Sequence, residues 1–372
     1  MTLTEIGYFA AEEPRWFGAE EILSVRYRQK VDLLFSGLPE MEMTLELYTK
    51  EPFTPQQEQK MEFYYDGTRY LTGYIMDCVR TGNHYRLTLR PRTEFLQTKF
   101  LGAVHEAAPL DGVLTELLGE QKPDYDETLL DATLTGYLPP ASRAQTLEQI
   151  AFALGTIPVM DRDGRLWLRS PLKETPMELA PQRLSLQPQV RLLPHYTRFE
   201  LAAHRYSRGQ YEKTLIHESE DPAEFFTFSN PHWYYVSATE EGGQVLDYGS
   251  NWVQIQRYGL LTLYAKPWLC QTQYHTLEGQ PSWDPLYSRV LTVRDKTLIH
   301  PENVQARLQN LKDLGQLRRQ VKLRYLAQDL SQAPRAGQPV RLPGLFGVVT
   351  GEELSVTKDR VHLDLTIMCK EE

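Results

Sequence analysis

The sequence predicts a mainly β protein with an α/β insertion, an α+β chain in which two barrel-like β-domains accompany a small helix-hairpin module. Two observations predict this fold class. Short segments that alternate apolar with polar residues fill residues 21–92 and return from residue 195 onward, as expected of half-buried strands. Between them, residues 109–155 have the apolar spacing of amphipathic helices. The 372 residues are enough for two to four domains of about 100–200 residues each.

The N-terminal part predicts a small antiparallel barrel or sandwich. Its strands are expected at residues 22–27, 43–48, 61–65, 70–79 and 85–90, separated by Gly, Pro or Asp turns. Pro52 and Pro55 flank Phe53 and exclude a strand there, because proline cannot donate a backbone hydrogen bond. Residues 1–100 are therefore predicted to form a β-barrel-like domain.

Residues 101–175 predict an α/β insertion module with two helices, joined by a loop at residues 123–138. The first helix is expected to start at Pro109, and its apolar face consists of Val113, Leu114, Leu117 and Leu118. The second has Ser142 as N-cap and Gln145 three residues later, a pair that can form a capping box. Its apolar stripe consists of Leu147, Ile150, Ala151 and Leu154. Gly155 suits the left-handed position after the last turn.

A hairpin is predicted directly after the second helix. Residues 158–160 and 165–169 are its strands, and the turn Asp161–Gly164 joins them through an Asp-Gly pair. The turn has some likeness to a calcium loop, but the twelfth position of such a loop needs a bidentate acid and is Leu172 here. A turn between two strands is therefore the favoured interpretation.

Strands are expected again in the second half of the chain. The proline-rich residues 171–194 predict an extended connection, and residues 176–285 predict a second β-domain. Its strands are expected at residues 197–206, 211–218, 233–238, 244–249 and 251–258, with Glu241-Gly-Gly as a hairpin loop. Residues 286–372 are expected to add a helix at 300–315, with Pro301 in its first turn, and strands at 320–328, 338–342, 346–350 and 360–368. No internal repeat of 20–50 residues is evident.

Composition excludes some classes of function. A formal net charge of −9 and a pI near 5.6 argue against a protein that mainly binds nucleic-acid phosphates. The densest basic run, Arg318–Arg324, is better explained as an exposed or interface strand. The N-terminus lacks the features of a secretory signal, and no apolar run reaches membrane-spanning length, so we expect a soluble protein made in the cytosol. Three widely spaced cysteines are expected to be buried or half-buried thiols.

No catalytic, cofactor-binding or metal-binding residue is predicted. None of the nine histidines falls in a His-x-His or His-x-x-x-His pair, although His195 with His204, or His232 with His275, could meet in the fold. Carboxylates are plentiful, but no pair is singled out for glycoside hydrolysis. A Gly-x-Ser-x-Gly elbow, a P-loop and a dinucleotide fingerprint are all absent.

The middle third of the chain is rich in aromatic residues. Three interpretations are open, of which a core role is favoured over a subunit interface and over saccharide contact. The residues are Trp233, Tyr234, Tyr235, Tyr248, Trp252, Tyr258, Tyr264, Trp268, Tyr274, Trp283 and Tyr287.

Four segments in the same order resemble a known family. They are the helix-hairpin segment at 134–169, the strand-turn-strand segment at 21–47, the hairpin at 63–75 and the strand entry at 336–342, where Gln338 replaces the usual acidic residue. Together they resemble the phage tail and baseplate hub proteins of tailed phages, prophages and phage-like injection systems of Gram-positive bacteria. The resemblance covers residues 20–170 and, more loosely, 285–370, whereas residues 175–285 show none.

The resemblance implies a structural role without catalysis or cofactors. In this family two barrel-like domains per subunit repeat around an axis, so a homotrimer joins the six-fold tail tube to the threefold tip or spike. Residues 1–100 and 286–372 would then form the hub in a virion tail baseplate. The implied partners are the tube protein, the spike or tip protein and other baseplate proteins, with nucleic acid only as passing cargo. The net charge suggests an acidic channel, and any needle or lytic domain is expected on another polypeptide.

Two other functions remain open. The aromatic-rich middle makes a carbohydrate-binding or receptor-binding tail module the alternative. A wall hydrolase is a third hypothesis, for which the sequence shows no catalytic pattern.

Overall fold

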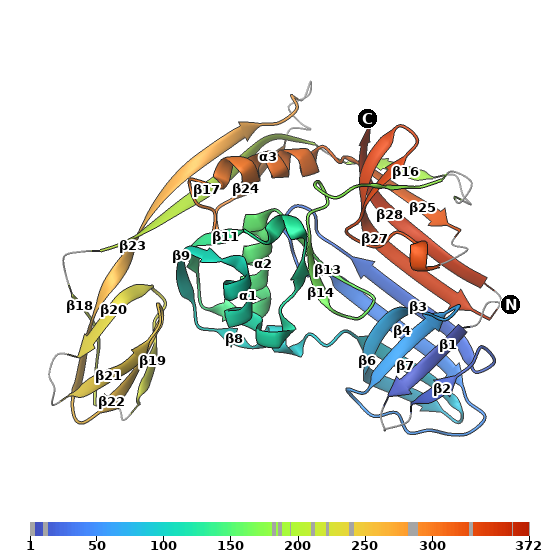
Figure 1. Ribbon diagram of the computed structural model, residues 1–372, viewed down its shortest axis with the longest axis horizontal. Helices are drawn as coiled ribbons and strands as arrows, with labels where there is room; N and C mark the ends of the chain where they lie inside the picture. The colour runs from blue at the N-terminus through green and yellow to red at the C-terminus, as the bar shows by residue number, and fades with distance from the viewer. Residues whose placement is uncertain are drawn as a thin grey trace.

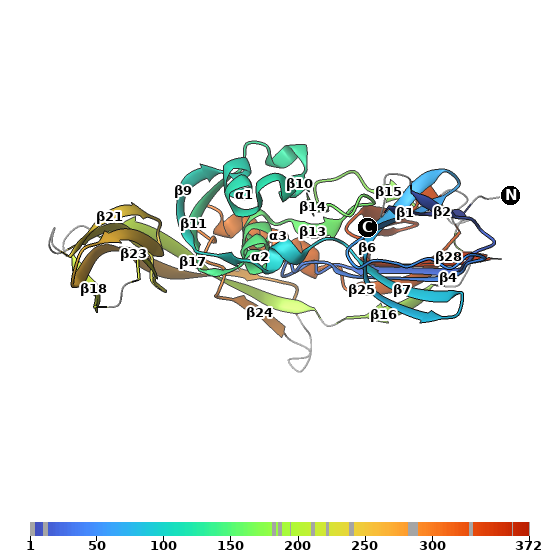
Figure 2. The same cartoon turned by 90° about the horizontal axis from the view of Figure 1, so that it is seen from below.

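The computed structural model describes residues 4–9, 14–180, 184, 188–193, 195–209, 213–220, 223–237, 242–281, 289–326, 330–358 and 360–371. These residues form three bodies in a row, with a large curved sheet at one end, a helix-containing module in the middle and a β-rich arm at the other end (Figure 1). The prediction of a mainly β fold is confirmed. A quarter turn shows an elongated molecule that is thinner in this direction, with β24 (Arg289–Val293) projecting from one side (Figure 2).

Thirteen of the described strands form the large sheet, which combines both ends of the chain. The N-terminal strands are β1 (Thr4–Phe9), β2 (Arg15–Phe17), β3 (Ile22–Lys30), β4 (Glu40–Tyr48), β5 (Lys60–Tyr65), β6 (Thr68–Thr81) and β7 (His84–Arg90). The later strands are β15 (Met177–Glu178), β16 (Gln189–Leu192), β25 (Arg319–Tyr325), β26 (Pro339–Leu342), β27 (Leu345–Thr357) and β28 (Arg360–Glu371).

Alternation along the strands divides the large sheet into a buried inner face and a polar outer face. On β3, Val25 and Tyr27 are buried, whereas Arg26 and Arg28 are exposed. The inner face forms one continuous hydrophobic core that runs from the N-terminal to the C-terminal strands. Such alternation stabilises an antiparallel sheet because apolar side chains leave water on one face only.

The central module is built on two helices and short strands. Its elements are η1 (Glu94–Gln97), β8 (Lys99–Phe100), β9 (Ala103–Pro109), α1 (Leu110–Leu118), η2 (Gly119–Gln121), β10 (Asp124–Tyr125), η3 (Glu127–Leu129), β11 (Thr133–Leu138), β12 (Ala141–Ser142), α2 (Arg143–Leu154), β13 (Ile157–Met160) and β14 (Leu166–Arg169). The predicted capping box between Ser142 and Gln145 is confirmed, and Gly155 ends α2 at φ 71°. The turn Asp161–Gly164 is also confirmed, because Asp161 accepts backbone hydrogen bonds from Asp163 and Arg165 at 2.8 Å each.

One loop prediction in the module is wrong. Residues 123–138 contain β10, η3 and β11 instead of a continuous loop. β10 pairs in parallel with β14, and β11 pairs with β9, so tertiary partners that lie far away in the sequence decide these short strands.

The arm is organised by two long strands. These are β17 (Tyr196–Arg208) and β23 (Leu261–Glu278), which pair over most of β17. At the tip lie β18 (Thr214–Ser219), β19 (Phe225–Thr227), β20 (His232–Ser237), β21 (Gly243–Tyr248) and β22 (Trp252–Arg257). The sequence did not indicate β23, since Pro267 interrupts it. That proline lies where β23 changes partner from β20 to β17, a position that tolerates the missing backbone donor.

α3 (Val304–Gly315) covers the base of the arm and starts later than predicted. Asn303 accepts a hydrogen bond from the backbone N–H of His300 at 2.8 Å, and residues 301–303 form a turn before the helix. A short η6 (Leu330–Gln332) precedes β26. Some residues of the predicted elements lie outside the described residues. They are Pro181, Pro194, Glu241 of the hairpin loop, Trp283, Tyr287 and residues 211–212, 238 and 327–328.

Strand pairing differs from the predicted boundaries of the second β-domain. Residues 176–285 were expected to form it, but β15 and β16 pair with β26 and β25 of the large sheet. The proline-rich connection thus contributes edge strands, which can be short and need a partner on one side only. The division into four domains and the two-barrel organisation remain predictions.

Candidate functional site

The described residues hold no group of three or more His, Cys, Asp or Glu side chains arranged to bind a metal ion. Of the four histidines considered as pairs, His204 and His232 have other partners. His204 lies 3.1 Å from Thr272 Oγ1 and 3.2 Å from the carbonyl oxygen of Arg294, and the ring of His232 packs against Tyr235. No described helix is both long and apolar enough to cross a bilayer.

The large sheet contains the same strand order twice. Its first half runs β3-β4-β7-β6-β5 and its second half runs β16-β25-β28-β27-β26, and every neighbouring pair in both runs is antiparallel. We call these runs the first half and the second half. In Figure 1 the first half is blue, and the second half is orange to red except for β16, which is light green. The repeat lies in the order of the strands, which explains why no repeated sequence was evident.

The hairpins of the two halves match residue by residue. Thr81 pairs with His84 in the first half, as Thr357 pairs with Arg360 in the second. This match places Leu87 and Leu89 at the positions of Leu363 and Leu365, and all four are buried. On the outer face it places Asp77 at the position of Glu353. The two hairpins therefore share register next to their turns, whereas their β-bulges differ in position, between Ile75 and Asp77 in the first half and between Val349 and Gly351 in the second.

A junction between β27 and β3 joins the halves within the chain. The two strands are antiparallel, from Gly351 opposite Lys30 to Thr357 opposite Ser24. By the same strand order, β6 is the counterpart of β27, and β16 is the counterpart of β3. Among the described strands, residues 77–81 of β6 pair only with β7, and β16 pairs only with β25. Residues 77–81 of β6 and the outer edge of β16 are thus unpaired among the described strands, whereas Ile75 of β6 already exchanges backbone hydrogen bonds with Glu58 and Gln59.

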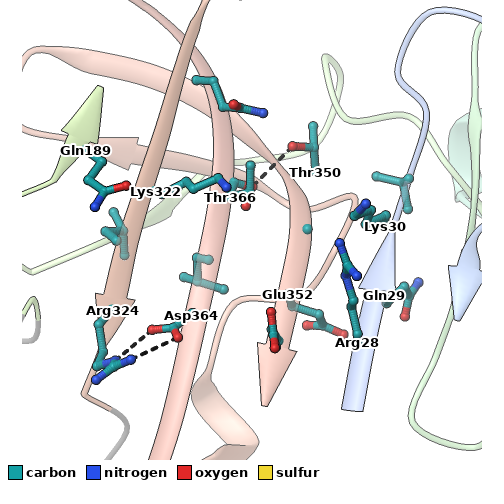
Figure 3. Close-up of a pocket in the computed structure, with 16 residues that line it drawn as sticks. Arg28, Gln29, Lys30, Gln189, Lys322, Arg324, Thr350, Glu352, Asp364 and Thr366 are labelled. Atoms are coloured by element: carbon teal, nitrogen blue, oxygen red, sulfur yellow. Dashed lines mark hydrogen bonds and ion pairs between the residues drawn. The ribbon is translucent and has the colours of Figure 1, made fainter. Parts of the chain in front are cut away.

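A groove of about 640 Å³ lies on the outer face over the second half and the junction (Figure 3). Arg28 and Lys30 enter it from β3, and Lys322 and Arg324 enter from β25. Arg324 donates to Asp364 of β28 through two hydrogen bonds, from Nε at 2.7 Å and from Nη2 at 3.1 Å. A hydrogen bond of 3.3 Å from Thr350 to the carbonyl oxygen of Thr366 crosses the floor.

The groove accounts for the position of the basic run Arg318–Arg324 in the fold. Alternation along β25 turns Gln320, Lys322 and Arg324 to the groove and turns Val321 and Leu323 to the core. The interpretation of Arg318–Arg324 as mainly a strand is confirmed. Cations and carboxylates share this face, since Glu353 and Asp364 also line the groove, so the face is not uniformly acidic.

A buried polar network lies on the inner side of the junction. Arg335 donates to Glu352 of β27 at 3.0 Å and to the hydroxyl of Tyr27 of β3 at 3.3 Å, and its guanidinium lies 4.7 Å from the ring centroid of Tyr70. Burial raises the pKa of Tyr70 to about 12. Burial also opposes the charge of Arg335, but Glu352 and the two tyrosines raise the pKa of that guanidinium, which stays charged.

The predicted hairpin attaches the module to the sheet near this network. The side-chain amide of Gln29 on β3 is oriented so that it satisfies both backbone groups of Met160. Its oxygen accepts from the Met160 N–H at 2.9 Å, and its nitrogen donates to the Met160 carbonyl oxygen at 3.3 Å. Arg162 donates to the carbonyl oxygen of Leu330 at 3.1 Å and lies over the ring of Tyr70. Asp163 forms an ion pair with Arg69. The hairpin therefore fixes the module against the core of the large sheet.

The aromatic residues of the middle third have divided roles. Tyr235 belongs to the core of the arm tip, which is the role favoured for the group, but it alone of the nine described members is buried. Tyr248, Tyr258 and Tyr274 are exposed. The cysteine prediction holds for Cys78 and Cys369, but Cys270, on the part of β23 that pairs with β17, is exposed.

The fold is thus that of a mainly β, half-barrel protein with an α/β module and an arm. Solved structures with this fold include the 43 kDa tail protein of prophage MuSo2 from Shewanella oneidensis, with 10% identity, a TM-score of 0.55 and 98% of each chain covered. A tail protein from Neisseria meningitidis MC58 has 12% identity and a TM-score of 0.54, with 98% of this chain and 96% of that chain covered. No family model and no curated protein sequence matches the chain. The resemblance to phage tail proteins is thus confirmed at the level of the fold.

Proposed function

We propose that this protein is a structural hub of a phage tail or phage-like injection machine and that it forms a ring in the baseplate or tail tip. The repeated strand order of the large sheet is the observation that carries the proposal. Each chain contains two halves with the same strand order. Three copies therefore provide six similar positions around an axis. A homotrimer would then present a pseudo-sixfold surface to a six-fold tail tube and a threefold surface to a tip or spike.

Ring formation has a physical basis in the unpaired edges. The edge of each half differs from its opposite edge, so a contact between copies joins two different surfaces and is heterologous. Such contacts form a ring when the rotation between copies closes. The likeness in fold to two prophage tail proteins supports a tail role. The proposed partners are the tube protein, the spike or tip protein and other baseplate proteins, with nucleic acid only as passing cargo.

Native mass spectrometry of the purified full chain tests the ring. We expect a species of three times 43.1 kDa and ring-shaped particles in negative-stain electron microscopy. Immunogold labelling of particles from the bacterium that carries the gene tests the location, and we expect label at the tail end. A chain that stays monomeric over the micromolar range, or label confined to the capsid, would contradict the proposal.

Exposed aromatic residues of the arm support a second candidate function, carbohydrate or receptor binding. Phe225 and Trp252 stack with ring centroids 5.7 Å apart at the arm tip, Phe225 is exposed, and Tyr248 and Tyr258 are exposed on neighbouring segments. Exposed aromatic rings are typical of saccharide contacts. Binding on a glycan array that Trp252→Ala abolishes would favour a carbohydrate-binding or receptor-binding module. A peptidoglycan clearing assay tests the wall hydrolase hypothesis, and we expect no clearing.

A further inference from the structure

We propose that the groove of Figure 3 binds an extended acidic segment of a partner protein, with Lys30 and Lys322 each pairing with one carboxylate of that segment. The segment would run across the strands and carry its two acids four residues apart. Binding of this kind needs only one copy of the chain, so it goes beyond the proposed ring and is independent of it. Its basis is a difference in charge between two neighbouring rows of residues that cross the sheet.

The first row is balanced in charge within the groove. Its strand partners follow in the order Arg28, Glu353, Asp364 and Arg324. Two carboxylates thus lie next to each other between two cations, and Arg324 binds Asp364 through two hydrogen bonds. Directly opposite residues on antiparallel strands have Cβ atoms about 4.5–5.5 Å apart, so Arg28 is close enough to compensate Glu353. This row therefore has no net charge to offer a ligand.

The second row lies two residues farther along each strand and carries uncompensated positive charge. It consists of Lys30, Gly351, Thr366 and Lys322. The side chain of Lys322 is exposed and has no ion pair or hydrogen bond among the described residues. Nζ of Lys30 lies 3.9 Å from Glu40 outside the groove, but the two side chains are 49% and 81% exposed, and such pairs contribute little. Both lysines are therefore available to an anionic ligand.

Small residues keep the floor of the second row low. Gly351 has no side chain, and a Cβ placed on it would lie 3.4 Å from Cβ of Thr366. In Figure 3, Lys322 extends from β25 toward Thr366, and Lys30 lies on the other side of β27. The two lysines thus form opposite walls of the groove, and the backbone of a ligand has room on the floor between them.

Strand spacing determines the length of the ligand. Lys30 of β3 and Lys322 of β25 are separated by three spacings between neighbouring strands, which amount to about 14 Å. An extended peptide rises about 3.3 Å per residue, so its side chains at i and i+4 lie on the same face about 13 Å apart. Two acids at this separation reach both lysines at once. Two adjacent acids point to opposite faces and reach only one of them.

Carboxylates of the first row favour a peptide over a nucleic acid. Glu353 and Asp364 lie only about 7 Å from the second row, measured along the strands. A nucleic acid carries a phosphate at every nucleotide and would place negative charge against these carboxylates. A peptide can carry uncharged residues between its two acids and avoids this repulsion. The chain has a formal net charge of −9, so a positively charged row on its surface has an acidic partner as its complement.

Ligand-observed NMR with the purified full chain tests the spacing of the acids. The probe is the acetylated and amidated peptide Glu-Thr-Thr-Thr-Glu, in which threonine favours an extended backbone. The control peptide Thr-Glu-Glu-Thr-Thr has the same composition and charge. We expect the spaced peptide to bind with a Kd at least about 3-fold lower than the control peptide. Equal dissociation constants, or no binding of either peptide at millimolar concentration, would overturn the proposal.

Substitutions in the full chain test the two lysines. Lys30→Gln and Lys322→Gln should each raise the Kd of the spaced peptide about 2- to 5-fold. The matched control is Arg26→Gln, which removes an exposed cation from the same face of β3, opposite Ser355 and outside the groove. Its Kd should equal that of the wild type, and thermal unfolding checks that every variant is folded. An effect of Arg26→Gln as large as that of the lysine variants would overturn the proposal.

Charge exchange tests the pairing directly. Lys322→Glu should abolish binding of the spaced peptide and favour Glu-Thr-Thr-Thr-Lys, whose lysine pairs with the new carboxylate. An exchanged peptide that binds this variant no better than the spaced peptide does would overturn the pairing. An oligothymidylate that binds the wild type more tightly than the spaced peptide would overturn it in favour of a nucleic acid. Trimers that bind no peptide would leave the proposed ring intact, whereas a monomeric chain that binds the spaced peptide would contradict only the ring.

Discussion

Arg335 and Glu352 form a buried ion pair, with 3.0 Å between Nε and Oε1, at the junction of the two halves of the large sheet. The second carboxylate oxygen of Glu352 accepts from the backbone N–H of Ala336 at 3.3 Å. Glu352 lies opposite Gln29 in the β27–β3 register, and Gln29 contacts the hairpin of the central module. One polar cluster thus connects the first half, the second half and the module.

Glu352→Gln is expected to destabilise the protein strongly. The guanidinium of Arg335 would remain buried without its counter-charge, which costs about 3–5 kcal/mol of unfolding free energy. Urea denaturation monitored by tryptophan fluorescence measures the loss. The matched control is Asp364→Asn, which breaks the half-exposed pair with Arg324 and should cost at most about 1 kcal/mol. Equal losses in the two variants would refute the structural role of the buried pair.

Gly337→Ala is expected to destabilise the protein more than Gly344→Ala. Both glycines have positive φ, at 84° and 70°, so each alanine introduces backbone strain of about 1 kcal/mol. At Gly337 a Cβ would also lie 2.5 Å from Cγ1 of Val159 in the module hairpin, whereas nothing lies within 4 Å at Gly344. We expect a further loss of about 1–3 kcal/mol at Gly337, measured by thermal unfolding. A smaller effect at Gly337 than at Gly344 would argue against close packing of the hairpin.

Acid should weaken the first half of the sheet through Glu62. Burial raises the pKa of Glu62, but hydrogen bonds from Tyr64 and Lys60 and the charge of Arg69 outweigh it, so the net pKa is lowered. A carboxylate with a depressed pKa stabilises the fold fully above its unfolded value, about 4.5, and this contribution is lost as pH falls through the folded pKa. Between pH 6 and pH 3, the melting temperature of the Glu62→Gln variant should therefore fall less than that of the wild type. A steeper acid loss in the variant would contradict this assignment.

Ser142→Ala should cost about 1 kcal/mol of stability, since the N-cap of α2 would lose its hydrogen bond to the Gln145 backbone N–H. Gln145→Ala removes the side-chain oxygen that accepts from the backbone N–H and the hydroxyl of Ser142 but keeps the N-cap bond, and should cost less. Chemical denaturation of both variants gives the comparison. A larger loss for Gln145→Ala would show that the capping box is not the main contribution at this end.

Local structure was the part of the fold that could be predicted from the sequence. The capping box of α2, the turn at Asp161–Gly164 and the strands around Leu45, Leu87 and Leu363 depend on residues close together in the chain. The partners of β10, the start of α3 and the course of β23 through Pro267 could not be predicted, because distant segments decide them. Similarity to phage tail proteins was also visible in the order of short motifs.

The sequence by itself determined which residues alternate between core and solvent, since hydrophobic spacing acts within each strand. Only the tertiary structure decided which strands become neighbours, because backbone hydrogen bonds between strands depend little on the identity of the side chains. Asp77 and Glu353 share a position in the repeated strand order, counted from the hairpin turns, without sharing a sequence pattern. The candidate assembly edges therefore emerged from strand pairing, although every residue on them was visible in the sequence.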